Sequence, residues 1–480
     1  MNGKAKKLIT SLFSLALAGA MGVSVACSSL PKKDTEGEGT VSGSVSGLTN
    51  ITDRVGDALN TDQFLSEELL NSAGEAPKLR ADGKRKIIVE FSKDSLLDTY
   101  LADSSCNQTI SFSEYVNSDE GKDYAQTLER EQSSFLRSLS SAKTSYELTH
   151  TYTSILNGVA IVVDDEDVAS VGKMKGVERV IYSETYAEPA AEATINEVDV
   201  YGTGIYDSSD ISYKGDGILV AVLDTGFDKS HRAFQEMPSS PRVSKEDIEE
   251  VFSDLEATTQ GDSITINDVY YNTKVPFAYD YADNDPDVFP KSSSHGMHVA
   301  GIIAGKDESA TVADGEAFEN EENGFIGVAP NAQPMICKGF PDREDGTEGG
   351  AETDDVLAAL SDCITVGVDV INMSLGTSAG FSRFLDDTAI NEVYDSIYAA
   401  GINLVGAASN SGSSASYGSY GSTNLTGNPD SGTVGWPSTY TEALSVASVS
   451  GQKSSYIELS DGTAIYFNEA SNAAGEAGDF

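Results

Sequence analysis

The sequence predicts an α/β protein in which a doubly wound parallel-sheet domain is preceded by a small α+β domain of ferredoxin-like design. Between residues 85 and 182, strand and helix patterns follow one another in the order β-α-β-β-α-β. From residue 217, a continuous apolar run opens a second series in which strand and helix patterns alternate. That alternation is typical of a parallel sheet covered by helices on both faces.

The composition limits the classes of partner. The chain has 31 Lys and Arg against 76 Asp and Glu, which gives a net charge of -45 over 480 residues. Nucleic acid and anionic lipid require clustered basic residues, so neither is an expected partner. An acidic chain is compatible with calcium binding. Four cysteines are too few for a disulfide framework, and pairing of Cys337 with Cys363 is left open.

The N-terminus carries an export signal, assigned to residues 1–26. Three lysines among the first seven residues precede an apolar run that is short for a membrane span. The run ends in small residues before Cys27, which resembles a bacterial lipobox and predicts lipidation of that cysteine. Ser24 and the alanine two residues later would also suit ordinary signal peptidase, which is the alternative to lipidation. Residues 27–84 are polar, without periodicity, and predict a flexible tether.

The smaller domain is assigned to residues 85–187 and is followed by an unpatterned connector, 188–210. Alternating apolar residues predict its strands and amphipathic periods predict its helices. In chain order, the expected elements are a strand at 86–91, a helix at 124–140, strands at 145–152 and 158–163, a helix at 165–174 and a strand at 177–182.

The larger domain is assigned to residues 211–450. Its expected strands are 217–223, 332–338, 368–374 and 403–408, and its expected helices are 295–304, 353–366 and 386–400. From residue 451 the chain becomes rich in Ser, Asp, Glu and Ala without a helical period. Residues 451–480 are therefore interpreted as the start of an inserted domain that is cut off, which leaves the larger domain incomplete.

An aspartate and a histidine are the first candidate catalytic residues. Asp224 follows the buried strand, where a carboxylate points into the crevice that binds ligands in α/β sheets. The alternative is an aspartate that caps a turn. His295 opens a helix, and His298 follows three residues later. A zinc pair is disfavoured because further ligands are not evident. A packed core histidine is the favoured interpretation of His298.

A third stretch, Asn403–Gly412, places Asn410 after a strand, which alone is only a turn signal. Together the three stretches resemble the subtilase family of serine proteases. Asp224 matches its Asp-Thr-Gly box, and His295 matches its His-Gly-Thr-His box, with methionine in place of threonine. Asn410 matches its Ala-Gly-Asn box, with serine in place of glycine. Residues 372–376 match the segment that lines the substrate backbone.

The resemblance implies roles for these residues. His295 would act as general base, and Asp224 would orient its imidazole. Asn410 would donate a hydrogen bond to the oxyanion. Substrate would add as a strand beside the segment formed by Ser374, Leu375 and Gly376. No nucleotide, redox cofactor or metal is required.

The family's nucleophile, in Gly-Thr-Ser-x-Ala-x-Pro, has no match between residues 411 and 480. Ser378 matches the first letters but precedes Asn410 and lacks the proline, so the match is interpreted as coincidence. Residues 1–480 alone are therefore expected to be inactive, with the serine beyond Phe480. The spacing of about 70 residues between Asp224 and His295, and the segment 275–281, resemble the lactocepin group.

Two functions follow from these patterns. The first is an exported serine endopeptidase that acts on proteins or peptides, either lipid-anchored at the cell envelope or secreted. In this case residues 85–187 resemble an inhibitory prodomain, with an unrelated binding domain as the alternative. The second function is a non-catalytic surface binding protein that has the subtilase fold without the nucleophile.

Overall fold

The computed structural model describes residues 79–80, 82–186, 213–259, 264–291, 293–306, 327–342, 349–376, 384–408, 434–447, 455–458 and 464–467. All of them belong to the unit Gly74–Phe480. The expected signal peptide, nearly all of the tether and the connector lie outside these residues. Among the described helices, none combines the length and apolar character needed to cross a membrane.

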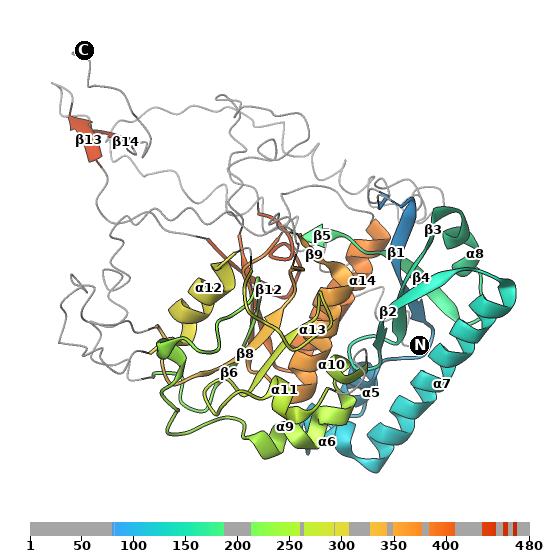
Figure 1. The fold of residues 1–480 in the computed structure, drawn as a ribbon, viewed down its shortest axis with the longest axis horizontal. Coiled ribbons are helices and arrows are strands. Elements are labelled where there is room, and N and C mark those ends of the chain that lie inside the picture. The colour runs from blue at the N-terminus through green and yellow to red at the C-terminus, as the bar shows by residue number, and fades with distance from the viewer. Residues whose placement is uncertain are drawn as a thin grey trace, which may run out of the picture. The chain divides into compact units, whose positions relative to one another are not determined.

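The smaller domain is a four-stranded antiparallel sheet with the strand order β2-β3-β1-β4 (Figure 1). This is the order of a ferredoxin-like sandwich, so the predicted α+β fold is confirmed. Its elements are β1 (Lys84–Phe91), α5 (Leu96–Ala102), α6 (Phe112–Asn117), α7 (Asp119–Ala142), β2 (Tyr146–Tyr152), β3 (Gly158–Asp164), η1 (Asp165–Asp167), α8 (Val168–Val171) and β4 (Val177–Tyr182).

The helices of this domain differ from expectation at their ends. Helix α7 begins at Asp119 rather than Tyr124, because the Ser118 side chain accepts a hydrogen bond from Gly121 N. The helix expected at 165–174 is replaced by a 3-10 turn and the single turn α8, which ends at Val171 and is followed by Gly172. Helices α5 and α6 were not predicted. Each is too short to show a period, and each is started by a serine cap.

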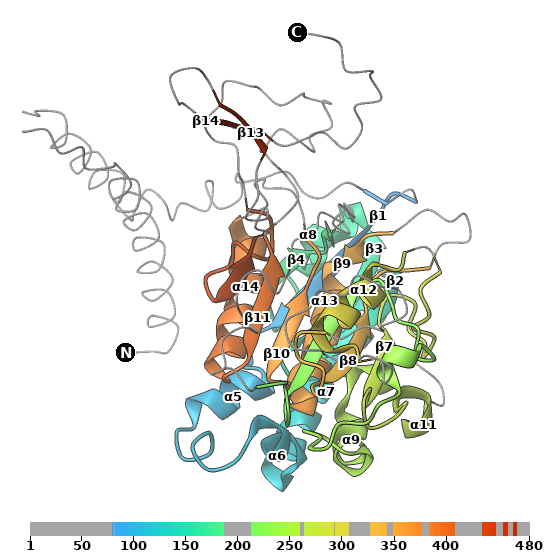
Figure 2. The ribbon, with the colours of Figure 1, turned by 90° about the vertical axis from the view of Figure 1, so that its left-hand side faces the viewer.

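The larger domain contains a six-stranded parallel sheet with the order β12-β11-β10-β6-β8-β7 (Figure 2). Its strands are β6 (Leu219–Asp224), β7 (Phe277–Asp280), β8 (Gln333–Lys338), β10 (Val370–Met373), β11 (Asn403–Ala407) and β12 (Ala443–Val446). Its main helices are α12 (His295–Ala304), α13 (Thr353–Val366) and α14 (Phe384–Ala399). The predicted doubly wound α/β fold is confirmed.

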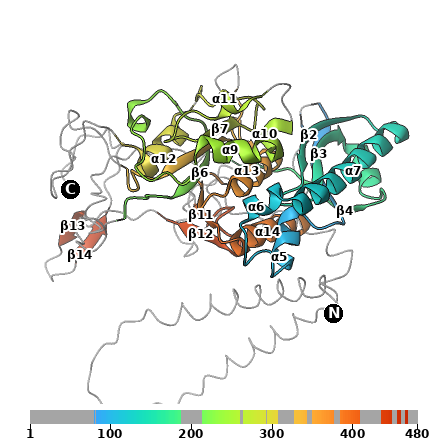
Figure 3. The ribbon, with the colours of Figure 1, turned by 90° about the horizontal axis from the view of Figure 1, so that it is seen from below.

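The side chains of β6 show how helices cover both faces. Ala221 and Leu223 pack in the cluster that includes α13 and α14, whereas Val222 packs with Ala300 of α12. Both faces are apolar, which is why the sequence shows a continuous apolar run there. Helices α13 and α14 lie between the parallel sheet and the sheet of the smaller domain (Figures 1 and 3).

Several short elements were not predicted, and most of them lie in the long insertion between Asp224 and His295. They are η3 (Arg232–Phe234), α9 (Lys245–Val251), η4 (Phe252–Asp254), α10 (Glu256–Thr259) and α11 (Ile266–Val269), together with β5 (Thr185–Tyr186), β9 (Ala351–Glu352) and the hairpin β13 (Ser455–Glu458) with β14 (Ala464–Phe467). Runs of two to seven residues carry too little pattern to be recognised in sequence.

Lys274 is fully buried, and its ammonium donates to the carbonyls of Pro330 and Ala332. Burial lowers the pKa of Lys274 from 10.5 to about 8. Between these values the unfolded chain holds a proton that the folded chain releases, so folding stability rises with pH.

The wild type should therefore gain roughly 3 kcal/mol over Lys274→Met as the pH rises through this window. Urea unfolding of both chains at several pH values measures the difference. If the free energies of unfolding of the two chains changed with pH in parallel, the lowered pKa of Lys274 would be contradicted.

Candidate active site

Asp224 is the last residue of β6 and is 2% exposed. Its Oδ1 accepts a hydrogen bond from Thr225 N at 2.7 Å and lies 2.7 Å from Nδ1 of His295. Its Oδ2 is buried without a hydrogen-bond partner among the described atoms. The strand end and the following backbone amide thus hold one carboxylate oxygen toward the histidine ring.

His295 is the first residue of α12, 71 positions beyond Asp224 in the chain. The pair meets because the first turn of α12 lies directly against the turn after β6. A Cβ on Gly296 would lie 2.6 Å from the Gly226 carbonyl oxygen, closer than real contacts allow. Gly296 is therefore required for the approach that brings the two side chains into hydrogen-bonding distance.

Hydrogen bonds of Thr225 hold the turn after β6 against the first turn of α12. Its hydroxyl accepts from Gly296 N at 2.9 Å and donates to the Ser293 carbonyl at 3.3 Å. Gly226 follows with φ +130°, a conformation that side chains disfavour, and a Cβ there would lie 2.7 Å from the Val288 carbonyl. Each residue of the Asp-Thr-Gly sequence therefore has its own structural role: Asp224 contacts the histidine, Thr225 bonds to the start of α12, and Gly226 allows the close approach of the backbone.

His298, the other histidine of this helix, is exposed. The interpretation of His298 as a packed core residue is wrong. The face of α12 that meets the sheet is formed by Gly296 and Ala300, and His298 lies outside it. It thus serves as a control residue on the same helix.

The structure places Ser374, Leu375 and Gly376 directly after β10. Met373 pairs with Leu223, so these residues continue from the edge of the sheet at which Asp224 lies. The Leu375 side chain is fully buried, and Ser374 accepts a hydrogen bond from Asn372 at 3.0 Å.

Three residues singled out in the sequence, Asn410, Ser378 and Cys27, lie outside the described residues. Their assigned roles stay predictions.

A strand pairing that the sequence did not reveal lies beside the Asp224–His295 pair. Strand β9 pairs antiparallel with β5 from the smaller domain, with Thr185 opposite Glu352 and Tyr186 opposite Ala351. Gly339 connects this pairing to the site: its amide donates to the Asp224 carbonyl, and a Cβ on it would lie 3.8 Å from Ala351.

Tyr186 is 3% exposed, so the end of the smaller domain is firmly seated against the larger one. The glycines at 349 and 350 were the available sequence signal for this close approach. A Cβ on Gly350 would meet the Thr185 side chain and the Tyr186 carbonyl.

The smaller domain also supplies a lysine and a histidine to the N-terminus of α13. The ammonium of Lys86 lies 2.9 Å from Asp354 Oδ2 and contacts Glu352. Burial would lower the pKa of Lys86, but the surrounding carboxylates outweigh burial and raise the pKa above its usual range. Nε2 of the buried His150 lies 3.0 Å from Asp355 Oδ1.

The pKa values of Asp354 and Asp355 shift in opposite directions, although the two carboxyls are neighbours. Burial would raise the pKa of Asp354, but Lys86 outweighs burial and the pKa falls below its usual value. Burial, followed by repulsion from Asp354, raises the pKa of Asp355 to about 7. The charge of Asp354 is thus maintained by a lysine from the other domain.

Two groups of described residues have the arrangement of metal ligands, and a lysine lies close to each. Asp280, Asp283 and Asp342 surround the ammonium of Lys338, which pairs with Asp280 and lies 3.2 Å from Asp342. The other group is His150 with Asp354 and Asp355, which Lys86 contacts. In each case an internal ammonium supplies the positive charge, so neither group supports a calcium site. Calcium binding elsewhere stays a prediction.

A buried Asp–His pair thus lies at the carboxyl edge of a parallel sheet, and a small domain is strand-paired to the larger one nearby. The chain belongs to the subtilase family. Residues 215–476 match the subtilase family, and residues 87–187 match the peptidase inhibitor I9 family.

Relatives agree with this assignment. The chain is 29% identical over 321 residues to the PI-type proteinase of Lactococcus lactis subsp. cremoris, which covers 65% of this chain and 15% of that protein. It is 31% identical over 244 residues to the C5a peptidase of Streptococcus pyogenes serotype M3, which covers 50% of this chain and 18% of that protein. The predicted relation to the lactocepin group is confirmed. The chain spans less than a fifth of the length of either relative.

Among solved structures, the chain is similar to fervidolysin from Fervidobacterium pennivorans, a keratinolytic enzyme related to subtilisin. The two are 17% identical with a TM-score of 0.37, over 71% of this chain and 43% of fervidolysin.

Proposed function

We propose that the protein, in a form that includes the serine nucleophile, is an exported endopeptidase that cleaves proteins or peptides and is held inactive by its own I9 domain. The observation that carries the proposal is the 2.7 Å separation of His295 Nδ1 and Asp224 Oδ1. A carboxylate at this distance fixes the imidazole tautomer and stabilises the imidazolium that forms when the ring accepts a proton.

In this mechanism, Nε2 of His295 removes the proton from a serine that is not among residues 1–480 and later gives it to the leaving amine. Asn410 donates to the oxyanion, a bond that strengthens only in the transition state. The rival function is a non-catalytic binding protein, which would have no need for the Asp224–His295 pair.

The proposed latency rests on the β5–β9 pairing. The Glu184 amide donates to the Thr353 hydroxyl, and the Glu184 carbonyl accepts from the Thr353 amide. The next two residues, Thr185 and Tyr186, complete the strand pair. A substrate adding as a strand at β9 would compete for the same backbone groups. Removal of the I9 domain is therefore part of the proposed activation.

Maturation should occur by cleavage in the connector, residues 188–210, which follows the paired strand β5 and precedes β6. N-terminal sequencing of active protein is expected to begin between residue 188 and Gly217. Active material that begins at Cys27 would contradict self-cleavage at this position.

Export with lipidation at Cys27 is the proposed localisation, motivated by the small residues before it and the polar tether after it. A clickable palmitate analogue should label the wild type and not Cys27→Ser, whereas Cys106→Ser should keep the label. Unlabelled wild type that is recovered in the medium would instead indicate ordinary signal cleavage.

A further inference from the structure

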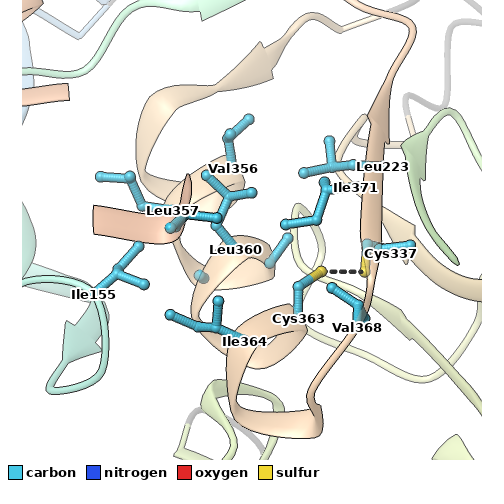
Figure 4. Packing of buried hydrophobic residues seen from close by; sticks show 14 of the residues in the cluster. Ile155, Leu223, Cys337, Val356, Leu357, Leu360, Cys363, Ile364, Val368 and Ile371 are labelled. Carbon is cyan, nitrogen blue, oxygen red and sulfur yellow. Dashed lines mark hydrogen bonds between the residues drawn. The ribbon is translucent and has the colours of Figure 1, made fainter. Parts of the chain in front are cut away.

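Two cysteines of the larger domain meet in its core. Cys337 is the fifth residue of β8, and Cys363 lies in the last turn of α13. Their Sγ atoms are 3.7 Å apart, and both residues are fully buried (Figure 4). The apolar side chains packed around them include those of Leu360, Val368 and Ile371.

The cysteine pair lies between two parts of the site that are distant in the sequence and close in the fold: the strand end at Asp224 and the helix α13, which begins beside Asp354. In the sheet, Cys337 pairs with Leu223, one residue before Asp224. At the other end of α13, Asp354 accepts the lysine of the I9 domain. The two cysteines are 26 positions apart in the chain, and the segment between them contains β9, with which β5 pairs.

Helix α13 depends on the I9 domain for part of its burial. Every residue of the helix is buried. One side contacts the I9 domain, since the Tyr152 hydroxyl donates to the Asp354 carbonyl and Ser154 lies 3.2 Å from Thr365. Cys363 lies on the side that faces β8. Loss of the I9 domain would uncover the first side only.

We infer that Cys337 and Cys363 are a disulfide site that fastens α13 to β8 and keeps the helix in place once the I9 domain has left. The inference concerns a covalent modification and does not depend on peptidase activity. Sulfur atoms in a disulfide are about 2.05 Å apart, so closure requires a small shift of the helix and strand.

The reaction needs a disulfide-bearing oxidant such as oxidised glutathione. One cysteine thiolate attacks the oxidant, forming a mixed disulfide and releasing one glutathione thiolate. The second cysteine then displaces the other glutathione, which forms the Cys337–Cys363 bond. In total two thiol hydrogens pass to the two glutathione molecules.

The timing of the reaction follows from burial. Burial, together with the neighbouring Cys337, raises the pKa of Cys363 well above its usual value, so the folded protein holds a thiol rather than the reactive thiolate. Oxidation should therefore take place while the chain folds, before the core excludes the oxidant.

The test is to unfold the 480-residue chain in urea with reductant and to refold it in a buffer of reduced and oxidised glutathione. Remaining thiols are alkylated in denaturant, and the peptides are mapped without reduction. The expected result is a linked peptide pair containing Cys337 and Cys363, lighter by two hydrogen atoms. Cys106→Ala should keep this pair, and Cys363→Ala should lose it.

The half-buried Cys106 reports whether the oxidant was competent. Refolded protein with glutathione on Cys106 and with alkylated Cys337 and Cys363 would overturn the inference. A second measurement compares linked and reduced chains in urea. The linked chain should unfold at a higher midpoint, because the bond closes a loop in the unfolded state. Equal midpoints would refute the proposed fastening of α13.

Discussion

His295→Ala should reduce the peptidase activity of the complete, serine-containing protein by a factor on the order of 10⁴ or more, because serine and histidine act as one unit in catalysis. The ring lost in this variant is the one placed 2.7 Å from Asp224. Activity is measured on a fluorogenic peptide and on a protein substrate, with circular dichroism as the check on folding.

His298→Ala is the matched control, since it removes the other histidine of α12 from an exposed position. It should retain activity and the wild-type unfolding midpoint. Equal loss in both folded variants would reject His295 as the base. A complete protein that is folded and inactive on all substrates would favour the binding-protein function.

Lys86→Met should destabilise the 480-residue chain by about 3–5 kcal/mol, because removal of one member of a buried ion pair leaves the other charge buried without its counter-ion. The Lys86 side chain is 12% exposed, and Asp354 beside it is fully buried. The lost interaction joins the two domains, so the smaller domain should also become easier to remove by added protease. Urea unfolding and limited proteolysis measure the two effects.

Lys93→Met is the control within the same domain. Lys93 lies 2.8 Å from Glu131, but its side chain is 43% exposed, so its loss should cost less than about 1 kcal/mol. If the two variants unfold alike, the Lys86 cluster does not hold the domains together.

The sequence by itself determined both fold classes and the positions of most main elements, although strands β7 and β12 of the parallel sheet were not predicted. Helices α12 and α13 have the bounds expected from their patterns, because long apolar periods reflect burial directly. Asp224 and His295 were also singled out in sequence, since each stands where a buried strand ends or a helix begins. The short elements α5, α6 and β9 were not found, because a single turn or a two-residue strand has no period.

Only the tertiary structure decided how these parts meet. Sequence spacing could not tell that His298 is exposed while His295 contacts Asp224, because both stand on the same helix and the packing of Gly296 selects the face. Nor could it pair Lys86 with Asp354, or Cys337 with Cys363, since these contacts join separate elements. Patterns along a chain record burial of each element, whereas contacts between elements depend on the packing of the whole domain.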